Sequence, residues 1–367
     1  NQFNLLLAVS IIVGVVERFA MLVIRMQKRG IAFSALRILA SVVNFIVVFL
    51  YATYISKDFY AIIYGTFASL IVSTLIAVLS AKNIWKIKKV EFDIVKAVLI
   101  YGFPFLPTFI ASWVFEGIDK LALRQYSTFY EIGLFTAAYK IVAILSILQM
   151  AFSTFWTPIA FEMYEKSSEE AKLTFAKVLN YICAALFICG VGMLLFKDVI
   201  ILLFEESYHN ASSIMPFLLL VPIMYTLSEV TVGGINYRNK TYWHLLIAVI
   251  AAITNYLLNL ILVPQLGAKG AAISTGISYI VFFYSRTFIS NYLFPIGMNY
   301  FRIHTSIILF LAIAFLNTFY SVATTTYIVT FIAIFLLFLL YKDELSFLKL
   351  YISKKQNRNI TDGSLKM

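Results

Sequence analysis

The chain has 367 residues, of which 62% are hydrophobic and only 13% are charged, and its mean hydropathy is +0.90. Soluble globular domains are roughly half apolar and about a quarter charged, so this composition excludes a soluble protein and indicates an integral membrane protein. The net charge of +11 does not indicate nucleic acid as a partner, because most basic residues lie in the connections between apolar runs.

Cysteine and histidine are too few and too scattered to suggest metal or covalent chemistry. Cys183 and Cys189 lie in one apolar run, and the three histidines form no cluster. This spacing fits neither a disulfide framework nor a metal site, and the chain has no GxxxxGK[ST] loop that would hold a nucleotide phosphate. We therefore expect no metal, no cofactor and no built-in ATPase, and a protein that is not an enzyme.

Apolar runs of about 20 residues follow one another along the chain, and a helix of that length spans the hydrocarbon core of a bilayer. No basic segment or cleavage site precedes the first run, so it is expected to be a membrane helix and not a signal peptide. The fold class we predict is all-α, with about eleven transmembrane helices over residues 5–24, 31–54, 60–80, 95–118, 132–155, 176–196, 213–234, 243–264, 269–290, 304–321 and 325–341.

Lysine and arginine are distributed unequally between the two sides of the predicted spans. The connections and tail on one side hold 21 of them, whereas those on the other side hold only Lys57, Lys120, Arg124, Lys197 and Lys269. Cytoplasmic loops carry the excess of basic residues. We therefore predict a multi-pass protein of the cytoplasmic (inner or plasma) membrane, with a cytoplasmic C-terminus and a basic cytoplasmic tail over residues 342–367.

A shift of 211 positions aligns a basic turn, a mid-helix Asn and the small-residue start of the next helix in two parts of the chain. It places Arg29 on Lys240, Asn44 on Asn255, and Gly65 on Gly276. Such internal repeats are typical of two-lobed transporters, although chance matches among apolar segments are the alternative. The same shift places the start of the first lobe about 115 residues before the chain begins, which leaves room for about three further helices.

The repeat divides the chain into four predicted parts. Residues 1–94 are the C-terminal part of a first lobe, with three helices and a truncated start. Residues 95–295 are a second lobe of six helices. Residues 296–341 are two additional helices, and 342–367 are the tail.

Two predicted helices contain pairs of prolines, Pro104 with Pro107 and Pro216 with Pro222. A proline inside a membrane helix frees a carbonyl and kinks the helix. The kinks are either hinges for a conformational change or static features of the packing.

Lys140 is the deepest cation in the predicted spans, about eight residues or roughly 12 Å into the helix over 132–155. Charged groups within a membrane usually face a watery cavity or a partner. No carboxylate lies one turn away in the sequence. We therefore expect Lys140 to face a central cavity, or else to pair with a carboxylate of another helix such as Glu116.

Other ionisable residues in the apolar runs leave more alternatives open. Arg18, Arg37 and Arg286 lie within about two turns of the cytoplasmic face and could extend to the interface, although Arg18 and Arg37 are also candidate cavity cations. The acidic and outer-end candidates for ion coupling or gating are Glu17, Glu116, Asp119, Lys120 and Glu229. Glu229 has no local cation. Glu116, Asp119 and Lys120 are alternatively no more than a charged helix end.

Three asparagines lie within apolar runs, namely Asn44, Asn255 and Asn259. Asn side chains in membrane helices commonly form hydrogen bonds between helices. We expect these bonds, and the alternative is contact with a polar ligand along a transport path.

Two stretches combine several short motifs. Residues 101–164 contain a Gly-x-Pro helix, an Asp-Lys pair, a Gly-to-Lys segment and a Trp-x-Pro, and residues 255–272 contain Asn-x-x-x-Asn, a Pro and a Gly-x-x-Gly-Ala-Ala. The combination resembles bacterial polysaccharide exporters of the Wzx type. The resemblance covers nearly the whole chain. The chain departs from the family pattern because it lacks most of the first lobe.

The resemblance implies a member of the multidrug/oligosaccharidyl-lipid/polysaccharide exporter superfamily, with twelve to fourteen helices in two lobes, and fourteen are expected here. Such a protein moves undecaprenyl-pyrophosphate-linked oligosaccharides across the membrane, for O-antigen or exopolysaccharide synthesis, by alternating access. Its partners are the lipid-linked oligosaccharide, membrane lipids and polysaccharide polymerase machinery. A cationic cavity suits an anionic pyrophosphate. The alternatives are an ion-coupled multidrug antiporter of the same superfamily and a membrane-embedded polysaccharide polymerase.

Overall fold

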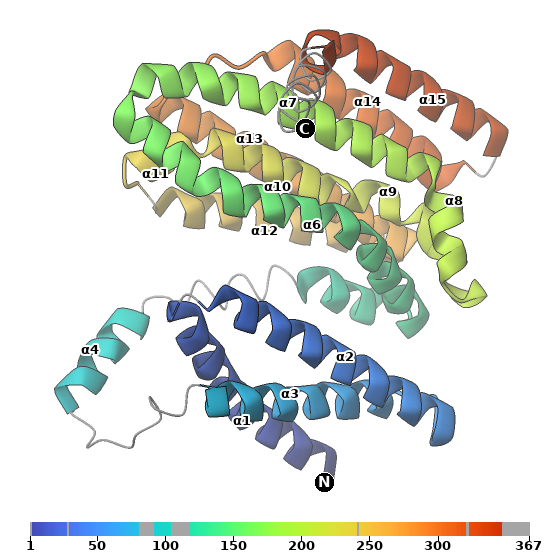
Figure 1. Ribbon diagram of the computed structural model, residues 1–367. Helices are drawn as coiled ribbons and strands as arrows, with labels where there is room; N and C mark the ends of the chain where they lie inside the picture. The colour runs from blue at the N-terminus through green and yellow to red at the C-terminus, as the bar shows by residue number, and fades with distance from the viewer. Residues whose placement is uncertain are drawn as a thin grey trace, which may run out of the picture. The chain divides into compact units, whose positions relative to one another are not determined.

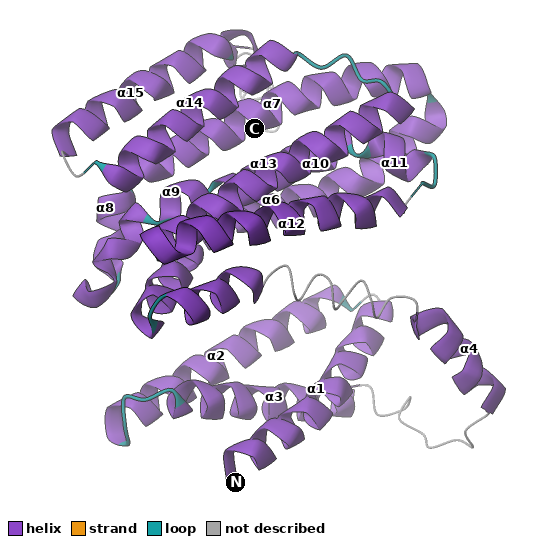
Figure 2. Cartoon of the chain, turned by 180° about the vertical axis from the view of Figure 1, so that it is seen from behind, coloured by secondary structure: helices purple, strands orange, loops and turns teal. Residues whose placement is uncertain are grey.

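A computed structural model describes residues 2–27, 29–80, 92–103, 117–240, 242–320 and 323–346. Within these ranges every regular element is a helix (Figure 2). Seven helices are long and apolar enough to cross a membrane, or eight if one bent pair is a single span. The predicted all-α membrane fold is therefore confirmed, whereas the expected number of eleven spans stays a prediction.

The chain forms two compact units, Asn1–Gly102 and Phe103–Met367 (Figure 1). The first contains α1 (Gln2–Met26), α2 (Gly30–Tyr54), α3 (Tyr60–Ser80) and α4 (Phe92–Gly102). In this unit α2 and α3 form an antiparallel hairpin, and α1 packs against both.

The α2–α3 hairpin depends on a capped turn and on a close approach of its helices. Asp58 accepts hydrogen bonds from the backbone N–H of Tyr60, at 2.9 Å, and from the hydroxyl of Ser56, at 2.6 Å. These bonds satisfy donors at the start of α3. Gly65 is buried against α2, where an added Cβ would lie 2.5 Å from a methyl group of Val48. A larger side chain at this position would push the two helices apart.

The second unit begins with a helical segment over residues 117–126. It continues with α6 (Phe129–Lys166), α7 (Ser168–Leu195), α8 (Lys197–Ile200), η2 (Ile201–Leu203), η3 (Glu206–Ser213), α9 (Met215–Leu218), α10 (Leu220–Thr231), α11 (Gly233–Tyr237), α12 (Tyr242–Leu266), α13 (Ala268–Leu293), α14 (Tyr300–Phe319) and α15 (Ala323–Leu340). One large apolar core joins most of these helices. Within the unit α12 and α13 form a hairpin, and α10 packs against α13, α6 and α7.

The helices α6 and α7 each begin at an N-cap hydroxyl group. Thr128 accepts a hydrogen bond from the N–H of Glu131, and Ser167 accepts one from the N–H of Glu170. In each case a hydroxyl satisfies one of the free donors at the helix start, and the acidic residue three positions later lies in the first turn.

Most predicted spans agree with the observed helices to within a few residues, but the helix predicted over 132–155 is much longer. It runs through Pro158 to Lys166 as α6. The helix continues beyond the end of the predicted apolar span, and an exposed ion pair between Lys166 and Glu162 supports this extension. Apolar length therefore underestimates this helix.

The region predicted as one helix over 213–234 is divided into three. The segment Met215–Thr231 is bent by 57° from the preceding 3-10 helix. Pro216 is the second residue of α9, next to the bend, and the helix tolerates it because the first turn has N–H groups without partners anyway. Its predicted role as a hinge stays a prediction. Pro222 lies in the first turn of α10, directly after the interruption at Leu219. Pro104 and Pro107 lie outside the described residues.

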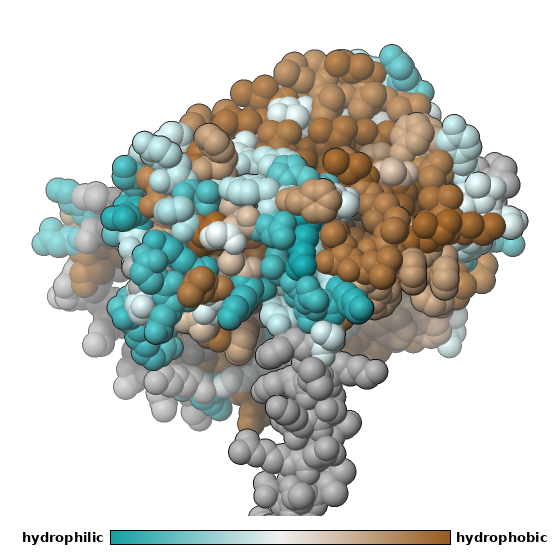
Figure 3. All heavy atoms as spheres, turned by 90° about the horizontal axis from the view of Figure 1, so that it is seen from above, coloured by the Kyte–Doolittle hydropathy of each residue, from teal (hydrophilic) through white to brown (hydrophobic). Residues whose placement is uncertain are grey.

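Seen from above, apolar side chains cover a broad part of the surface, and polar side chains gather beside it (Figure 3). On α15 the exposed large apolar residues include Phe331, Phe335 and Leu339. A contiguous apolar surface of this kind is typical of contact with a membrane.

Candidate functional site

Asp119 is the centre of a buried hydrogen-bond network in the second unit. Its side chain belongs to the helical segment 117–126 and is only 4% exposed. Oδ1 accepts from the amide groups of Asn255, at 3.1 Å, and Asn259, at 2.8 Å, whereas Oδ2 accepts from the hydroxyl of Thr275, at 2.8 Å. One carboxylate thus joins three separate helices.

The α12–α13 hairpin positions these partners. Asn255 and Asn259 lie one turn apart on α12, so they share a face, and the amide of Asn259 also donates to Asn255 at 3.0 Å. Gly267 links the two helices with a positive φ of 55°, a conformation that glycine adopts without strain. At Gly270 an added Cβ would lie 2.3 Å from the carbonyl oxygen of Leu262. The glycines therefore allow the close packing that brings α13 to Asp119.

The three side chains that donate hydrogen bonds to the carboxylate are neutral, and the ammonium group of the neighbouring Lys120 also acts on its charge. Within the described residues no lysine or arginine is paired with Asp119, and the oxygen Oδ1 of Asn259 is buried without a hydrogen-bond partner. Carboxylate, amide and hydroxyl oxygens together are suitable ligands for a proton or a small hard cation. Burying an uncompensated charge is costly, so either ligand would stabilise this site.

A cavity of about 360 Å³ gives access to the network. Its apolar walls come from α6 and α10, and its polar surface comes from Asp119 and the hairpin. The residues that line it are Asp119, Lys120, Phe135, Thr136, Tyr139, Val221, Asn255, Thr275 and Tyr279. The carboxylate is therefore buried in protein but next to a space that a ligand could enter.

The described helical segment runs from residue 117 to residue 126, and Asp119 lies in its first described turn with a buried side chain. Both alternatives for Asp119, a coupling group and a charged helix end, stay predictions. Lys120 is exposed and lines the same cavity. Glu116 lies outside the described residues. The sequence did not single out Thr275, and its only signal was a position in the small-residue run of the following helix.

The asparagines form bonds between helices, and Asn255 also lines the cavity, so both alternatives stay predictions. Asn255 and Asn259 join α12 to the segment that carries Asp119. In the first unit, the amide of Asn44 on α2 donates to Thr66 on α3 at 3.4 Å.

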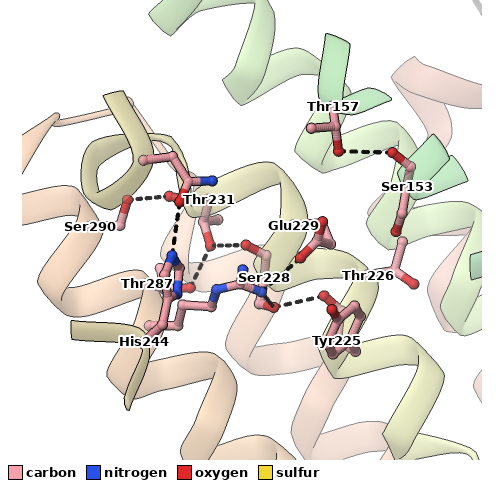
Figure 4. A network of polar contacts seen from close by, with 12 residues as sticks. Ser153, Thr157, Tyr225, Thr226, Ser228, Glu229, Thr231, His244, Thr287 and Ser290 are labelled. Carbon is pink, nitrogen blue, oxygen red and sulfur yellow. Dashed lines mark hydrogen bonds and ion pairs between the residues drawn. The ribbon is translucent and has the colours of Figure 1, made fainter. Parts of the chain in front are cut away.

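A second polar network lies between α10 and α13 (Figure 4). Arg286 is 8% exposed and donates to Glu229 at 2.8 Å and to Ser228 at 2.8 Å. Its guanidinium group lies over the rings of Phe282 and Tyr225. The expectation that Arg286 extends to the interface is wrong, because a carboxylate 57 positions away satisfies it inside the protein. Glu229 likewise has a cation that its neighbours in sequence do not supply.

The same network extends to the interruption between α10 and α11. Ser290 donates to the carbonyl oxygen of Thr231, at 2.5 Å, and accepts from the N–H of Gly234, at 2.8 Å. The hydroxyl groups of Thr231 and Thr287 lie 2.7 Å apart (Figure 4). Side chains of α13 thus replace helix bonds near the break. Because Arg286 already compensates the charge of Glu229, this network is better suited to holding helices together than to binding an ion.

The predicted cavity cations have different surroundings. Arg37 on α2 forms an ion pair at 3.3 Å with Glu17 on α1, which is 6% exposed. Arg18 and Lys140 are both exposed on their own units, and Lys140 has no ion pair within the described residues. The roles assigned to these four residues stay predictions.

Comparison with known proteins gives two matches. Residues 2–213 match the model of a family described as polysaccharide biosynthesis protein. Among solved structures, the chain is similar to the lipid II flippase MurJ in an inward closed conformation, with a TM-score of 0.60 and 19% identity over 84% of this chain. The match covers 66% of that structure, so the chain spans less than two thirds of its length. No curated protein sequence matches significantly.

Proposed function

Because the chain belongs to the polysaccharide biosynthesis protein family and has the fold of a lipid flippase, we propose that it moves lipid-linked oligosaccharides across a membrane. The proposed substrate is an undecaprenyl-pyrophosphate-linked repeat unit of a cell-surface polysaccharide. The protein acts as a transporter and not as an enzyme. The unequal distribution of basic residues supports a location in the bacterial cytoplasmic membrane with the C-terminus inside.

Asp119 is the proposed coupling group, and the observation that supports this role is its burial among neutral donors beside a cavity. A proton on the carboxylate would remove one of its acceptor sites and weaken the bonds to α12 or α13. A small cation would instead draw the surrounding oxygens together. Occupancy therefore changes how firmly three helices are joined, and a ligand that favours one arrangement shifts the population toward it.

Lys140 is the strongest candidate for contact with the pyrophosphate. It is exposed and has no ion pair within the described residues, whereas the charge of Arg37 is partly compensated by Glu17. A lysine near a pyrophosphate is stabilising where water is scarce. Arg18 and Arg37 remain secondary candidates.

The proposal is tested by movement of a labelled undecaprenyl-pyrophosphate oligosaccharide in proteoliposomes that contain the full-length protein. We expect Lys140→Ala to abolish movement and Lys140→Arg to retain part of it. We expect Asp119→Asn to remove the response to a proton or sodium gradient, and the matched control is Asp93→Asn, an exposed acid in α4.

Each outcome has a distinct meaning. Full movement with Lys140→Ala would exclude its role as a cavity cation. An unchanged gradient response with Asp119→Asn would exclude its role in coupling. Drug efflux without oligosaccharide movement would favour the multidrug antiporter, which is the alternative that a buried carboxylate beside a cavity also suits.

A further inference from the structure

The second unit contains another cavity, of about 330 Å³, where the ends of α8, α13, α14 and α15 meet η3. The residues that line it are Lys197, Asp198, Asn210, Ser212, Ser213, Lys269, Asn317, Thr318, Phe319, Tyr320, Thr326 and Tyr327. It shares no lining residue with the cavity at Asp119. In the proposed orientation, these helix ends lie on the outer side of the membrane.

Two lysines supply an excess of positive charge in this cavity. Lys197 has a side chain that is only 13% exposed, and its Nζ lies 3.7 Å from Asp198. Lys269 donates to the carbonyl oxygen of Thr318 at 2.9 Å, and no carboxylate is paired with it within the described residues. The single carboxylate also accepts a hydrogen bond from Tyr327 at 2.7 Å. The cavity lining therefore carries two ammonium groups and one carboxylate, and that carboxylate is already shared between Lys197 and Tyr327.

A buried hydroxyl group in the cavity wall lacks a partner. Thr318 is 3% exposed, and its Oγ1 forms no hydrogen bond within the described part of the chain. Leaving such a group unsatisfied is unfavourable. A ligand oxygen in the cavity would remove that cost.

Aromatic rings complete the wall. The ring of Phe319 lies beside Lys269, whose Nζ is 5.8 Å from the ring centroid, and Tyr320 and Tyr327 also line the space. A tyrosine ring packs against an apolar face of a ligand, and its hydroxyl group forms hydrogen bonds with polar groups. A sugar ring has both kinds of surface.

We propose that this cavity binds a phosphate-bearing sugar, with the phosphate between Lys197 and Lys269 and the sugar against the aromatic wall. This inference rests on the proposed function, since it assigns the head group of the lipid-linked substrate to a second subsite at the outer end of the unit. The volume lies at the lower end of the range for ligand pockets, about 300–1,000 Å³, and suits one phosphorylated sugar. Ammonium–phosphate hydrogen bonds are charge-assisted and supply the affinity.

The test is isothermal titration of the purified full-length protein with glucose 1-phosphate, glucose and inorganic phosphate in phosphate-free detergent buffer. Glucose 1-phosphate is expected to bind at least about tenfold more tightly than glucose. Lys197→Gln and Lys269→Gln should each weaken its binding by about tenfold or more. Asp198→Asn should strengthen binding, because it removes the only carboxylate among the lining residues.

The matched control is Lys240→Gln, an exposed lysine before α12 that lies a full 25-residue helix, or about 37 Å, from the start of α13. This variant should bind like the wild type. Lys269→Arg guards against loss of fold, since it keeps the charge and should retain most of the binding. Equal binding by all variants, or no preference for the phosphorylated sugar, would overturn the proposal.

Two further measurements are needed. One identifies whether the bound phosphate belongs to a lipid head group or to a sugar, and the other distinguishes failure of this inference from failure of the proposed function. Competition by phosphatidylglycerol in nanodiscs would assign the site to a lipid head group and overturn the assignment to the sugar. Binding that follows the expected pattern in a protein that moves no lipid-linked oligosaccharide would retain the site and reject the flippase. Movement of the substrate without this binding would retain the flippase function and reject the second binding site.

Discussion

Asp119 shows most clearly how a residue acquires its environment from distant parts of the chain. Its three partners lie 136, 140 and 156 positions away. Nothing next to it in the sequence distinguishes it from an acidic group at a helix end. Its burial follows from the packing of the 117–126 segment against the α12–α13 hairpin.

We predict that Asp119→Ala destabilises the protein more than Asp119→Asn. The alanine leaves the donors of Asn255, Asn259 and Thr275 unpaired, at a cost of about 1–3 kcal/mol for each buried group left unsatisfied. An asparagine still offers one acceptor and should cost less. Thermal unfolding in detergent measures the difference, and equal melting temperatures for both variants would contradict the network.

The ion pair between Glu229 and Arg286 provides a second prediction. Removing one partner leaves a buried charge, which typically costs about 3–5 kcal/mol, whereas neutral residues at both positions are tolerated better. We therefore expect the double variant Glu229→Gln/Arg286→Met to be more stable than the single variant Glu229→Ala, in which Arg286 is left without its carboxylate. A double-mutant cycle by chemical denaturation checks this, and additive effects would show that the two side chains act independently.

At the scale of elements, helix positions could be predicted from the sequence because an apolar run is a local property. The lengths of α2, α3 and α12 agree closely with the predicted spans. Disagreement occurs where tertiary contacts replace helix bonds, as at the α10–α11 interruption, or where a helix continues past its predicted apolar span, as in α6. Neither the interruption nor the extension alters the apolar content of the local sequence, so neither could be predicted from it.

The contacts of two glycines predict how tightly helices of the second unit must pack. A Cβ at Gly234 would lie 2.0 Å from the carbonyl oxygen of Ser290, and one at Gly276 would lie 2.6 Å from that of Phe217. Either alanine substitution should destabilise the unit by about 1–3 kcal/mol, since backbone atoms must move. Gly192→Ala is the control, because nothing lies within 4 Å of its added Cβ, and it should be neutral or stabilising. Thermal unfolding of the three alanine variants measures these differences in stability.

At the scale of the whole molecule, the division into two compact units occurs at Gly102 and Phe103. The predicted boundary between lobes, at residues 94 and 95, lies close to it but is not tested by this division. Each unit contains one of the hairpins that the 211-residue shift aligns, α2–α3 and α12–α13. The proposed duplication is consistent with these paired hairpins and stays a prediction.

The predicted orientation is tested by labelling with a membrane-impermeant maleimide. Glu206→Cys should react in intact cells, whereas Arg238→Cys should react only after permeabilisation, because the loop charges place them on opposite sides. Cys183 is buried and Cys189 lies within a span, so the unsubstituted protein serves as the background control. The reverse labelling pattern would invert the topology and move the second cavity to the cytoplasmic side.

The sequence by itself determined the membrane class, the helical fold and most helix positions, because the length and polarity of a run decide whether it can span a bilayer. The repeated motifs also indicated the family. Only the tertiary structure decided which polar residues meet. The partners of Asp119 and Arg286, and the lysines of the second cavity, depend on how each helix is rotated and packed against others, which no local pattern specifies.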